Sequence, residues 1–434
     1  MRASSRRVLG TLAVSLTFVG VAVAAPFIPN MQGYSNASGT LRTYSTLGDL
    51  DQANDFFQSL GTNGRRCSTC HMLSQGLGLS AAMARQIFEN SNGLHPLFRP
   101  HDAANSPEMD VSSVFARRQT YSMLLSKGLF RIGIGIPANA EFSLVGIDDP
   151  YGYASASELS LFRRPLPATN LKFLTQVMWD GRRTFAGQTM TFNLGSQANG
   201  ATLGHAQATQ PLTQAQRTEI VSFETSLFSA QASDRLAGGL TDAGARGGPQ
   251  ALAAQVFRVR INSPLSSTFT PRVFTIYDSW QTATGTLGPA RQAVFRGQQL
   301  FNFRRFSFNG QTVTCSRCHN SFNAGSDSNA QMFAIGTTFA SRRTPDMPLY
   351  TLRNNATGAR TLTTDPGRAL ITGRWNDIGR FKIPTLRGLA ARPPYFHNGI
   401  AATLNDVVTF YETRFSIGLT AQDRADLAAF LRAL

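Results

Sequence analysis

RRCSTCHML, residues 65–73, places Cys67 and Cys70 three positions apart with a histidine directly after the second cysteine. The same arrangement returns as CSRCH at 315–319, so all four cysteines of the chain lie in C-x-x-C-H motifs. In such a motif each thiol forms a thioether with a haem vinyl group, and the histidine becomes an iron ligand. The pattern therefore predicts two covalently bound haem c groups, attached through Cys67, Cys70, Cys315 and Cys318, with His71 and His319 as iron ligands.

Two other interpretations of paired cysteines fit less well. A four-cysteine zinc site also uses two C-x-x-C pairs, but it needs no histidine after each pair, and its pairs normally lie closer together. A thioredoxin-like dithiol is expected as a single C-x-x-C beside a βαβ pattern, and no such pattern follows either motif. Haem attachment is the interpretation that uses every residue of both motifs.

The first 24 residues, MRASSRRVLGTLAVSLTFVGVAVA, combine a basic start, an apolar run and a small-residue end. This is the pattern of a secretory signal peptide cleaved before Ala25. A retained membrane anchor is the alternative, but the uncharged run of about 17 residues is short for a membrane span. We therefore expect an exported, periplasmic protein without a stable membrane span, and covalent haem attachment outside the cytoplasm agrees with export.

The formal net charge is +16, and almost all of the basic residues are arginines, because the chain has only three lysines. No basic run or nucleic-acid motif is present, and an exported protein has little access to nucleic acid, so we expect no nucleic-acid partner. Haem propionates need cationic partners, which arginine supplies well. A basic face could also attract an acidic redox protein.

Helices are expected at 79–92, 108–128 and 212–232, and two more are expected to start at Thr403 and Thr420. Thr213, Thr403 and Thr420 each begin a capping-box pattern. A short helix and a loop precede each C-x-x-C-H motif. The segment 130–155 alternates apolar residues with Gly and Pro, which favours short strands or extended loops.

The resulting fold class is mainly α, with two cytochrome c-like haem domains and a long irregular insertion. We expect an N-terminal haem domain at 25–235, with the insertion at about 80–160, and a C-terminal haem domain at 291–434. Between them, residues 236–290 are expected to form a linker or loop region, because 236–251 is rich in Gly and Ala and indicates an exposed segment.

Two further stretches carry a family resemblance: MWDGRRTFAGQTMTFNLGSQANGATLGHAQ (178–207) and FKIPTLRGLAARPPYFHNGIAATLNDVVTFY (381–411). Together with the two haem motifs, they resemble the bacterial di-haem cytochrome c peroxidase superfamily, which includes the methylamine-utilisation di-haem enzymes. The resemblance covers roughly 45–75 and 160–434 and leaves 80–160 unexplained. It implies that the first haem meets peroxide and that the second passes electrons.

The same resemblance assigns roles to two aromatic residues. Trp179 matches the tryptophan that lies between the haems, where an indole shortens the distance for electron transfer. Tyr411 falls where the peroxidases have a methionine ligand for the second haem, and where the methylamine-utilisation enzymes have a ligating tyrosine. A phenolate lowers the reduction potential of iron relative to a thioether. Met332 and Met347 are rival ligands for the second iron.

On the open side of the first haem, the resemblance supplies Gln197 as the family's glutamine, but the family's proline and glutamate fall on Ala201 and Gln207. Because a glutamine cannot exchange a proton, efficient peroxide turnover would need another acid or base. His205 is two residues away, and imidazole suits proton transfer near neutral pH. We expect it to be that group or a sixth iron ligand, and His95 and His101 are alternative sixth ligands.

Further family features map less directly. Arg164, Arg182 and Arg387 are expected propionate partners, and His397 is expected to shape the turn beside the second haem. The family also holds a calcium ion between the haems, at positions near Pro165, Arg392 and Pro394. The family's asparagine at the first of these positions is proline here, so one calcium ion is only a candidate cofactor.

The expected function is peroxide reduction by a periplasmic, c-type di-haem oxidoreductase of the cytochrome c peroxidase type. Hydrogen peroxide would be the substrate, and a small cytochrome or copper protein would be the electron donor; a homodimer is a candidate assembly. Two alternatives remain. The protein could use peroxide to oxidise an organic or protein substrate, or it could be a non-catalytic electron-transfer protein with two closed haems.

Overall fold

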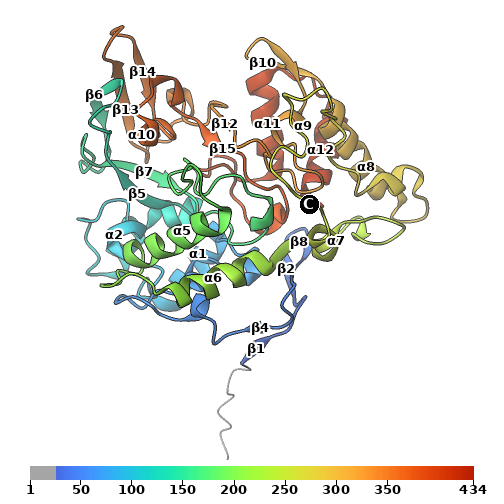
Figure 1. Ribbon diagram of the computed structural model, residues 1–434, viewed down its shortest axis with the longest axis horizontal. Helices are drawn as coiled ribbons and strands as arrows, with labels where there is room; N and C mark the ends of the chain where they lie inside the picture. The colour runs from blue at the N-terminus through green and yellow to red at the C-terminus, as the bar shows by residue number, and fades with distance from the viewer. Residues whose placement is uncertain (1–25) are drawn as a thin grey trace, which may run out of the picture.

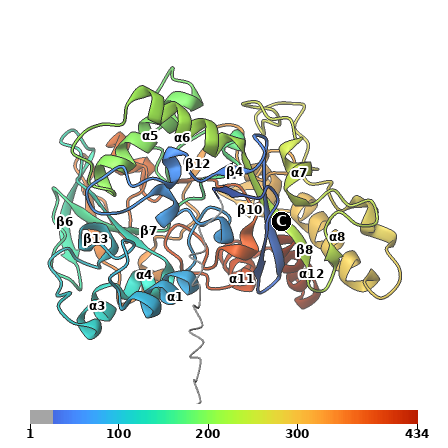
Figure 2. The ribbon, with the colours of Figure 1, turned by 90° about the horizontal axis from the view of Figure 1, so that it is seen from below.

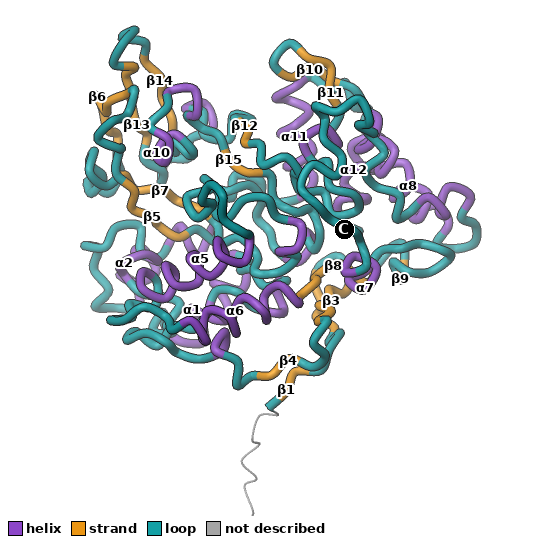
Figure 3. Tube along the Cα trace, in the orientation of Figure 1, coloured by secondary structure: helices purple, strands orange, loops and turns teal. Residues whose placement is uncertain are grey.

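The computed structural model describes residues 26–434, so the expected signal peptide lies outside the described part of the chain. Helix makes up 33 % and strand 17 % of these residues. The expectation of a mainly α fold is therefore confirmed only in part: helix exceeds strand, but the fold is mixed. The physical reason is that buried main-chain groups must be hydrogen-bonded, and the irregular segments satisfy this need by pairing as short strands, seen in several small sheets in Figure 3.

The helices gather in two groups at opposite sides of the molecule, as Figure 1 and, turned by 90°, Figure 2 show. The first group holds α1 (Ala81–Ser91), α2 (Pro100–Ala103), α3 (Val114–Thr120), α4 (Ser122–Lys127), α5 (Met190–Gly204) and α6 (Gln214–Ser226). The second holds α7 (Gly248–Ala253), α8 (Gly288–Phe303), α9 (Cys315–Cys318), α11 (Leu404–Phe415) and α12 (Ala421–Arg432). A further short helix, α10 (Ala369–Thr372), lies beside the sheet at the edge of the first side.

Three capping boxes begin helices where the sequence predicted them. The side chains of Thr213, Thr403 and Thr420 each accept a hydrogen bond from the main chain three residues on, and the side chain at that position bonds back. These reciprocal bonds satisfy main-chain groups that the first turn of a helix leaves unpaired. The predicted starts of α6, α11 and α12 are therefore confirmed.

Two other helix predictions need correction. The helix expected at 108–128 is divided into α3 and α4, with Tyr121 between them. The helix expected at 212–232 ends at Ser226, because the chain continues as β8 (Leu227–Asp234), which pairs antiparallel with β3 (Gly39–Ser45). Pairing with a distant strand overrides the local helical preference of this segment.

The main sheets join segments that are far apart in the sequence. One has the order β2-β3-β8-β9, with β2 at Gly33–Asn36 and β9 at Gly238–Gly239. A second has the order β14-β13-β6, formed by Arg360–Thr363, Leu349–Asn354 and Phe142–Asp148. Its strand β6 comes from the expected insertion and pairs with the C-terminal half of the chain. The insertion is thus held in the body of the fold.

Four two-stranded sheets complete the set. The pairs are β1 (Phe27–Ile28) with β4 (Leu50–Asp51), β5 (Phe130–Ile134) with β7 (Leu159–Arg163), β10 (Phe306–Phe308) with β11 (Gln311–Val313), and β12 (Met332–Phe333) with β15 (Phe381–Lys382). The β5–β7 pair confirms the extended structure expected for the start of 130–155. It also leads directly into Arg163 and Arg164, which lie beside the site described below.

The segment expected to be a linker is packed in one part and exposed in another. Ala237 and Leu240 are fully buried, and so is Trp280. These residues belong to the apolar core that α8 and α12 form, where the main chain of Asp426 comes so close to Gly297 that a side chain there would clash. This part of 236–290 therefore supports the second C-x-x-C-H motif, because its apolar side chains gain free energy by leaving water.

Within residues 26–434, no helix is long and apolar enough to cross a membrane.

Candidate functional site: two matched histidine turns and a cavity

The two C-x-x-C-H motifs have the same local geometry. In each, the main-chain nitrogen of the histidine donates to the carbonyl of the first cysteine, at 3.0 Å for His71 and 3.1 Å for His319. Each Nδ1 atom lies within hydrogen-bonding distance of the carbonyl six residues on, Leu77 at 3.0 Å and Gly325 at 2.6 Å. A Nδ1–H that donates to a carbonyl leaves Nε2 with a free lone pair, which is how a metal-ligating histidine is normally oriented.

Burial keeps both imidazoles neutral. It lowers the pKa of His71 and lowers that of His319 to about 4, although the carbonyl contacts act in the opposite direction. A phenylalanine supports each ring, with centroids 6.5 Å apart for Phe56 and His71 and 5.8 Å apart for Phe301 and His319. Since only neutral imidazole ligates iron, both histidines fit the role that the sequence predicted.

A cavity opens beside the first motif, with an empty volume of about 1550 Å³ that includes space open to solvent. Cys67, Cys70 and His71 line it together with apolar residues from several elements, among them Phe130, Ile132, Leu171 and Leu194. Burial raises the pKa of the Cys70 thiol to about 11 and raises that of Cys67 as well. An apolar cavity with two free thiols and a neutral histidine in its wall fits a covalently attached haem.

Helix α5 presents the other expected site residues to this cavity. Gln197, Ala201 and His205 are spaced four residues apart, so they share one face of the helix, and all three line the cavity. Gln207, in contrast, is exposed, adopts a φ of 55° and does not line the cavity. The residue that matches the family's glutamate therefore lies outside the site, and His205 is the titratable group on this wall.

His205 is held by a residue that the sequence did not indicate. Its Nδ1 lies 2.6 Å from Oδ2 of Asp102, which comes from α2 in the insertion. Arg65, two residues before the first motif, donates to the same oxygen at 2.6 Å and to the main-chain oxygen of His205 at 3.1 Å. Burial alone would raise the pKa of Asp102, but hydrogen bonds from His101 and His205 and the charge of Arg65 hold it well below its usual range.

The other candidate ligands on this side do not line the cavity. The Nε2 atom of His101 lies 3.3 Å from Oδ2 of Asp102, and the Nδ1 atom of His95 accepts a hydrogen bond from the main-chain nitrogen of Leu97 at 3.1 Å. Of the three histidines considered as a sixth ligand, His205 is the one that the structure places in the cavity wall.

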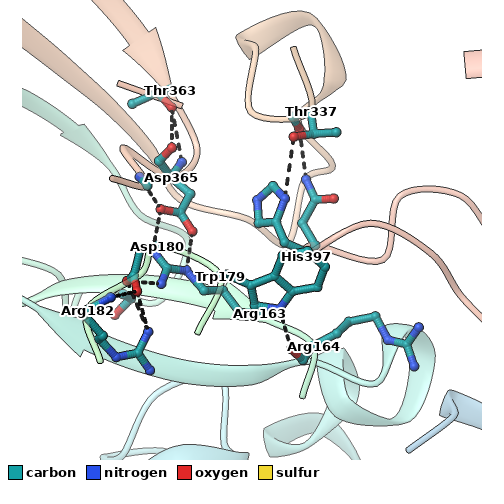
Figure 4. Close-up of polar contacts among 12 residues, drawn as sticks. Arg163, Arg164, Trp179, Asp180, Arg182, Thr337, Thr363, Asp365 and His397 are labelled. Carbon is teal, nitrogen blue, oxygen red and sulfur yellow. Dashed lines mark hydrogen bonds and ion pairs between the residues drawn. The ribbon is translucent and has the colours of Figure 1, made fainter. Parts of the chain in front are cut away.

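Trp179 also lines the cavity, on the side that faces the C-terminal half of the chain. Figure 4 shows its indole nitrogen donating to the main-chain oxygen of Arg164, at 2.8 Å, with His397 packed against the ring. The centroids of the indole and imidazole rings are 6.2 Å apart, and His397 stacks on Phe381 at 4.0 Å. His397, expected beside the second motif, thus lies against the tryptophan.

Several buried cations near the cavity have no carboxylate partner. Arg164 gives its guanidinium to the main-chain oxygens of Arg392 and Leu79, and burial lowers its pKa to about 9. Lys382 donates to the main-chain oxygen of Gln176 at 3.0 Å, and burial lowers its pKa to about 7. Uncompensated buried charge is unfavourable, so these side chains fit a site that also holds anions, such as haem propionates.

The other two expected propionate partners differ. Arg182 lines the cavity but pairs with Asp180 at 3.0 Å, and Figure 4 shows Asp180 shared with Arg163. Arg387 is fully buried, and its Nε, Nη1 and Nη2 atoms all donate to main-chain oxygens, including that of Leu434 at 3.1 Å. Arg387 does not line the cavity, so its observed contacts stabilise the packing of the C-terminal half.

The positions expected to hold calcium do not suit a cation. The main-chain oxygen of Arg392 accepts from the Arg164 guanidinium at 2.6 Å, and the Arg392 side chain is itself buried, with one nitrogen that has no partner. Two guanidinium groups at this point would repel Ca²⁺ and occupy an oxygen that it needs. Within residues 26–434, no group of three or more His, Cys, Asp or Glu side chains is arranged to hold a metal ion either.

Tyr411 lies beside the second motif, on α11. Burial raises the pKa of its hydroxyl, and the nearby thiols of Cys315 and Cys318 act in the same direction. The rival methionines lie elsewhere. Met332 is paired opposite Lys382 in the β12–β15 sheet, and Met347 packs in a cluster with Met123, Leu129 and Phe162. Of the three candidates for the second iron, the structure brings Tyr411 next to the cysteines.

Sequence reasoning missed three further residues of the cavity wall: Asp102, Lys382 and Glu224. Burial raises the pKa of Glu224 to about 8, so this carboxyl group is protonated at neutral pH. A signal existed for Lys382, because one of only three lysines in the chain stands in the apolar stretch FKIPTL. Asp102 and Glu224 carry no local signal, since they reach the cavity through tertiary packing.

The geometry of both motifs and the cavity fits covalent attachment of haem. No protein-family model matches the sequence. Among curated proteins, it is 39 % identical over 88 residues to cytochrome-c peroxidase IdrP1 of Denitromonas iodatirespirans, covering 18 % of this chain and 23 % of that protein. It is 30 % identical over 159 residues to IdrP1 of Pseudomonas sp. strain SCT, covering 32 % and 39 %. It is 42 % identical over 72 residues to cytochrome c551 peroxidase of Nitrosomonas europaea, covering 16 % and 21 %.

The names of these relatives, together with both haem motifs, support the resemblance to the di-haem cytochrome c peroxidase superfamily that the sequence predicted. The matches span less than half the length of each curated relative. Among solved structures, a MauG-like protein associated with microbial copper homeostasis gives a TM-score of 0.31 at 16 % identity, covering 65 % of this chain and 77 % of that one. Hydrazine synthase of Kuenenia stuttgartiensis gives 0.32 at 16 %, covering 82 % and 93 %, and neither likeness adds to the assignment.

Proposed function

We propose that the chain is a periplasmic di-haem c oxidoreductase that reduces hydrogen peroxide with electrons from a small redox protein. The observation that carries this proposal is the single cavity in which His71 lies in one wall and Gln197 and His205 lie on the α5 face. A proximal ligand and a polar, proton-exchanging wall are the two parts that peroxide reduction requires. The names of the curated relatives support the same reaction.

Two haem groups follow from the matched motifs. His71 and His319 would hold the two irons through Nε2, because the Nδ1 atom of each is taken by a carbonyl. The buried cations Arg164 and Lys382 would pair with propionates of the group in the cavity. When bound, the first haem would supply an iron that binds peroxide and two electrons for cleavage of the O–O bond.

The side chains of the cavity wall would direct that cleavage. His205 would accept the proton of the peroxide oxygen nearer the iron through Nε2 and return it to the far oxygen, which leaves as water with both electrons of the broken bond. The amide of Gln197 would donate a hydrogen bond that orients the peroxide. Two electrons and two protons from outside complete the reduction of peroxide to two water molecules.

Electrons would reach the cavity through Trp179. This residue lies in the cavity wall, and its ring contacts His397 on the side of the C-terminal half. A small cytochrome or copper protein with an acidic face would be a suitable donor, because the chain carries a net charge of +16. We propose that electrons enter at the second haem and cross to the first through this indole.

The test is peroxide consumption by the purified, haem-loaded protein, with and without a reduced small cytochrome. Rapid oxidation of the cytochrome that depends on peroxide, at two cytochromes per peroxide, supports the proposal. Failure to oxidise any reduced small cytochrome or copper protein, while peroxide leaves both haem spectra unchanged, contradicts it and favours an electron-transfer protein with two closed haems.

One observation favours a second function, the peroxide-dependent oxidation of an organic or protein substrate. Tyr411 lies beside Cys315 and Cys318, where it would give the second iron an anionic ligand and stabilise its oxidised form. The protein could then store oxidising equivalents until a substrate arrives. A long-lived oxidised state after peroxide addition, without turnover of a reduced cytochrome, supports this function over the first.

A further inference from the structure

We infer that Asp102 is a positioning residue that fixes the Nδ1 side of His205, so that His205 presents Nε2 to the cavity as the proton acceptor. This role deepens the proposed function and rests on it, because it concerns the same reacting proton. It also assigns a functional role to the insertion, since Asp102 lies on α2 within the residues 80–160 that the family resemblance leaves unexplained.

The contacts of Asp102 are arranged around one oxygen. Oδ2 lies 2.6 Å from Nδ1 of His205 and 2.6 Å from Nη1 of Arg65, while Nε2 of His101 lies 3.3 Å away. Asp102 is 5 % exposed, so its carboxylate is sheltered from water, whereas the side chain of His205 is 44 % exposed. A buried carboxylate of this kind favours the tautomer in which Nδ1 carries the proton, which leaves the Nε2 lone pair free.

The other carboxylate oxygen of Asp102 makes no hydrogen bond with the imidazole or the guanidinium. Oδ1 is buried and has no hydrogen-bond partner in the protein, and Asp102 is part of the cavity wall. Buried polar atoms are normally paired, and Oδ1 is an exception. The bonds to Nδ1 of His205 and Nη1 of Arg65 are therefore made by Oδ2 alone.

Arg65 holds Asp102 in place from the opposite side. It is 3 % exposed and also donates to the main-chain oxygens of Pro96 and Leu97, at 2.9 Å each. Because Arg65 lies two residues before the first haem motif in the sequence, it joins the insertion, the motif and His205 into one unit. If Asp102 acted only in packing, its carboxylate would not need a hydrogen bond to the imidazole of His205.

The test uses cyanide, which must lose its proton before it binds iron and so reports proton acceptance without turnover. Cyanide association with the oxidised, haem-loaded protein is followed by absorbance in the wild type and in His205→Gln, Asp102→Asn and Asp102→Glu. Asp102→Glu keeps a negative charge for Arg65, so a folding defect caused by an unpaired arginine would appear only in Asp102→Asn. Asp110→Asn and His95→Gln, which change insertion residues outside the cavity wall, are matched controls.

We expect His205→Gln to slow cyanide association by about 10²–10⁴-fold, the range typical of a lost general base. Both Asp102 variants should also slow it, but neither should slow it further in the His205→Gln background, because Asp102 acts through His205. Equal slowing by Asp102→Asn in both backgrounds would make its role structural and overturn the inference. Faster cyanide association in His205→Gln would also overturn the inference, because it would show that His205 occupies the iron position that cyanide needs.

The same data separate this inference from the proposed function. If cyanide kinetics follow the expected pattern but no reduced cytochrome is oxidised, the role of Asp102 stands and donor-dependent peroxide reduction fails. If the cytochrome is oxidised but the rate of cyanide association is the same in the wild type and the Asp102 variants, the inference fails and the proposed function stands.

Discussion

The indole of Trp179 packs edge to face against the imidazole of His397, with 6.2 Å between the ring centroids. The main chain reinforces this contact, because the nitrogen of Arg164 donates to the oxygen of His397 at 2.7 Å while its oxygen accepts from the indole. Trp179 is thus fixed between the cavity and the PYFHNG turn. Its position suits transfer of electrons from one half of the molecule to the other.

Replacing Trp179 with phenylalanine should slow electron transfer between the two haems by at least about tenfold, because the smaller ring is harder to oxidise and lengthens the gap. The measurement is flash reduction of the second haem followed by the absorbance of the first. Trp375→Phe, which changes a tryptophan that packs near Phe142, should leave the rate unaltered. An unchanged rate in Trp179→Phe would remove the indole from the electron path.

Tyr411→Phe should raise the reduction potential of the second haem and change its low-temperature electron paramagnetic resonance spectrum, because an anionic ligand is lost. The measurement is a potentiometric titration of both haems. Tyr151→Phe, in the insertion, is the control and should change neither haem. A spectrum and potential unchanged in Tyr411→Phe would show that another group ligates the second iron.

Lys382→Gln should lower the reduction potential of the first haem, because a nearby positive charge favours the reduced and less positive iron. The titration used for Tyr411 measures this shift. Lys127→Gln is the matched control, since Lys127 already pairs with Asp346 at 2.7 Å. A potential that stays the same in Lys382→Gln would place the amine too far from the cofactor to act as a propionate partner.

Glu224 predicts a dependence of stability on pH. Burial raises its folded-state pKa to about 8 from an ordinary value of 4.5, so the folded protein keeps a proton that the unfolded chain releases. Its contribution is therefore fully present below about pH 4.5 and is lost as the pH rises towards 8, by up to about 1.4 kcal/mol for each pH unit.

Glu224→Gln imitates the protonated acid and should remove this dependence. In denaturant unfolding, the variant should match the wild type near pH 5 and exceed it in free energy of unfolding at pH 8. Glu219→Gln, an exposed residue on the same helix, should follow the wild-type curve. Parallel curves for Glu224→Gln and the wild type would contradict the raised pKa.

Local patterns predicted part of the fold because their causes are local. The Thr213 capping box marks the start of α6 and depends on residues three positions apart. The end of α6 could not be predicted in the same way, since Leu227 begins a strand whose partner, β3, lies far back in the sequence. The buried linker residues were missed for a similar reason, because Gly- and Ala-rich sequence suits close packing as well as exposed loops.

In the candidate site, too, residues with a local sequence signal could be predicted, and residues that arrive through tertiary packing could not. His71 follows from the spacing of its motif, and Gln197 and His205 follow from the family resemblance; the structure places these three around one cavity, which His319 does not line. Asp102 could not be found from spacing, because the bond to His205 joins residues 103 positions apart. Departure from the family pattern at Gln207 did indicate that another group was needed on that wall.

The central claim is that the chain binds two covalent haem groups and that peroxide reacts at the one in the cavity beside His71. The most direct measurement is haem content per chain together with the absorbance change on peroxide addition, in the wild type, Cys67→Ala/Cys70→Ala and Cys315→Ala/Cys318→Ala. We predict two haems in the wild type and one in each variant, with loss of the peroxide reaction only in Cys67→Ala/Cys70→Ala. A wild type with one haem, or a peroxide reaction that survives loss of the first motif, would contradict the claim.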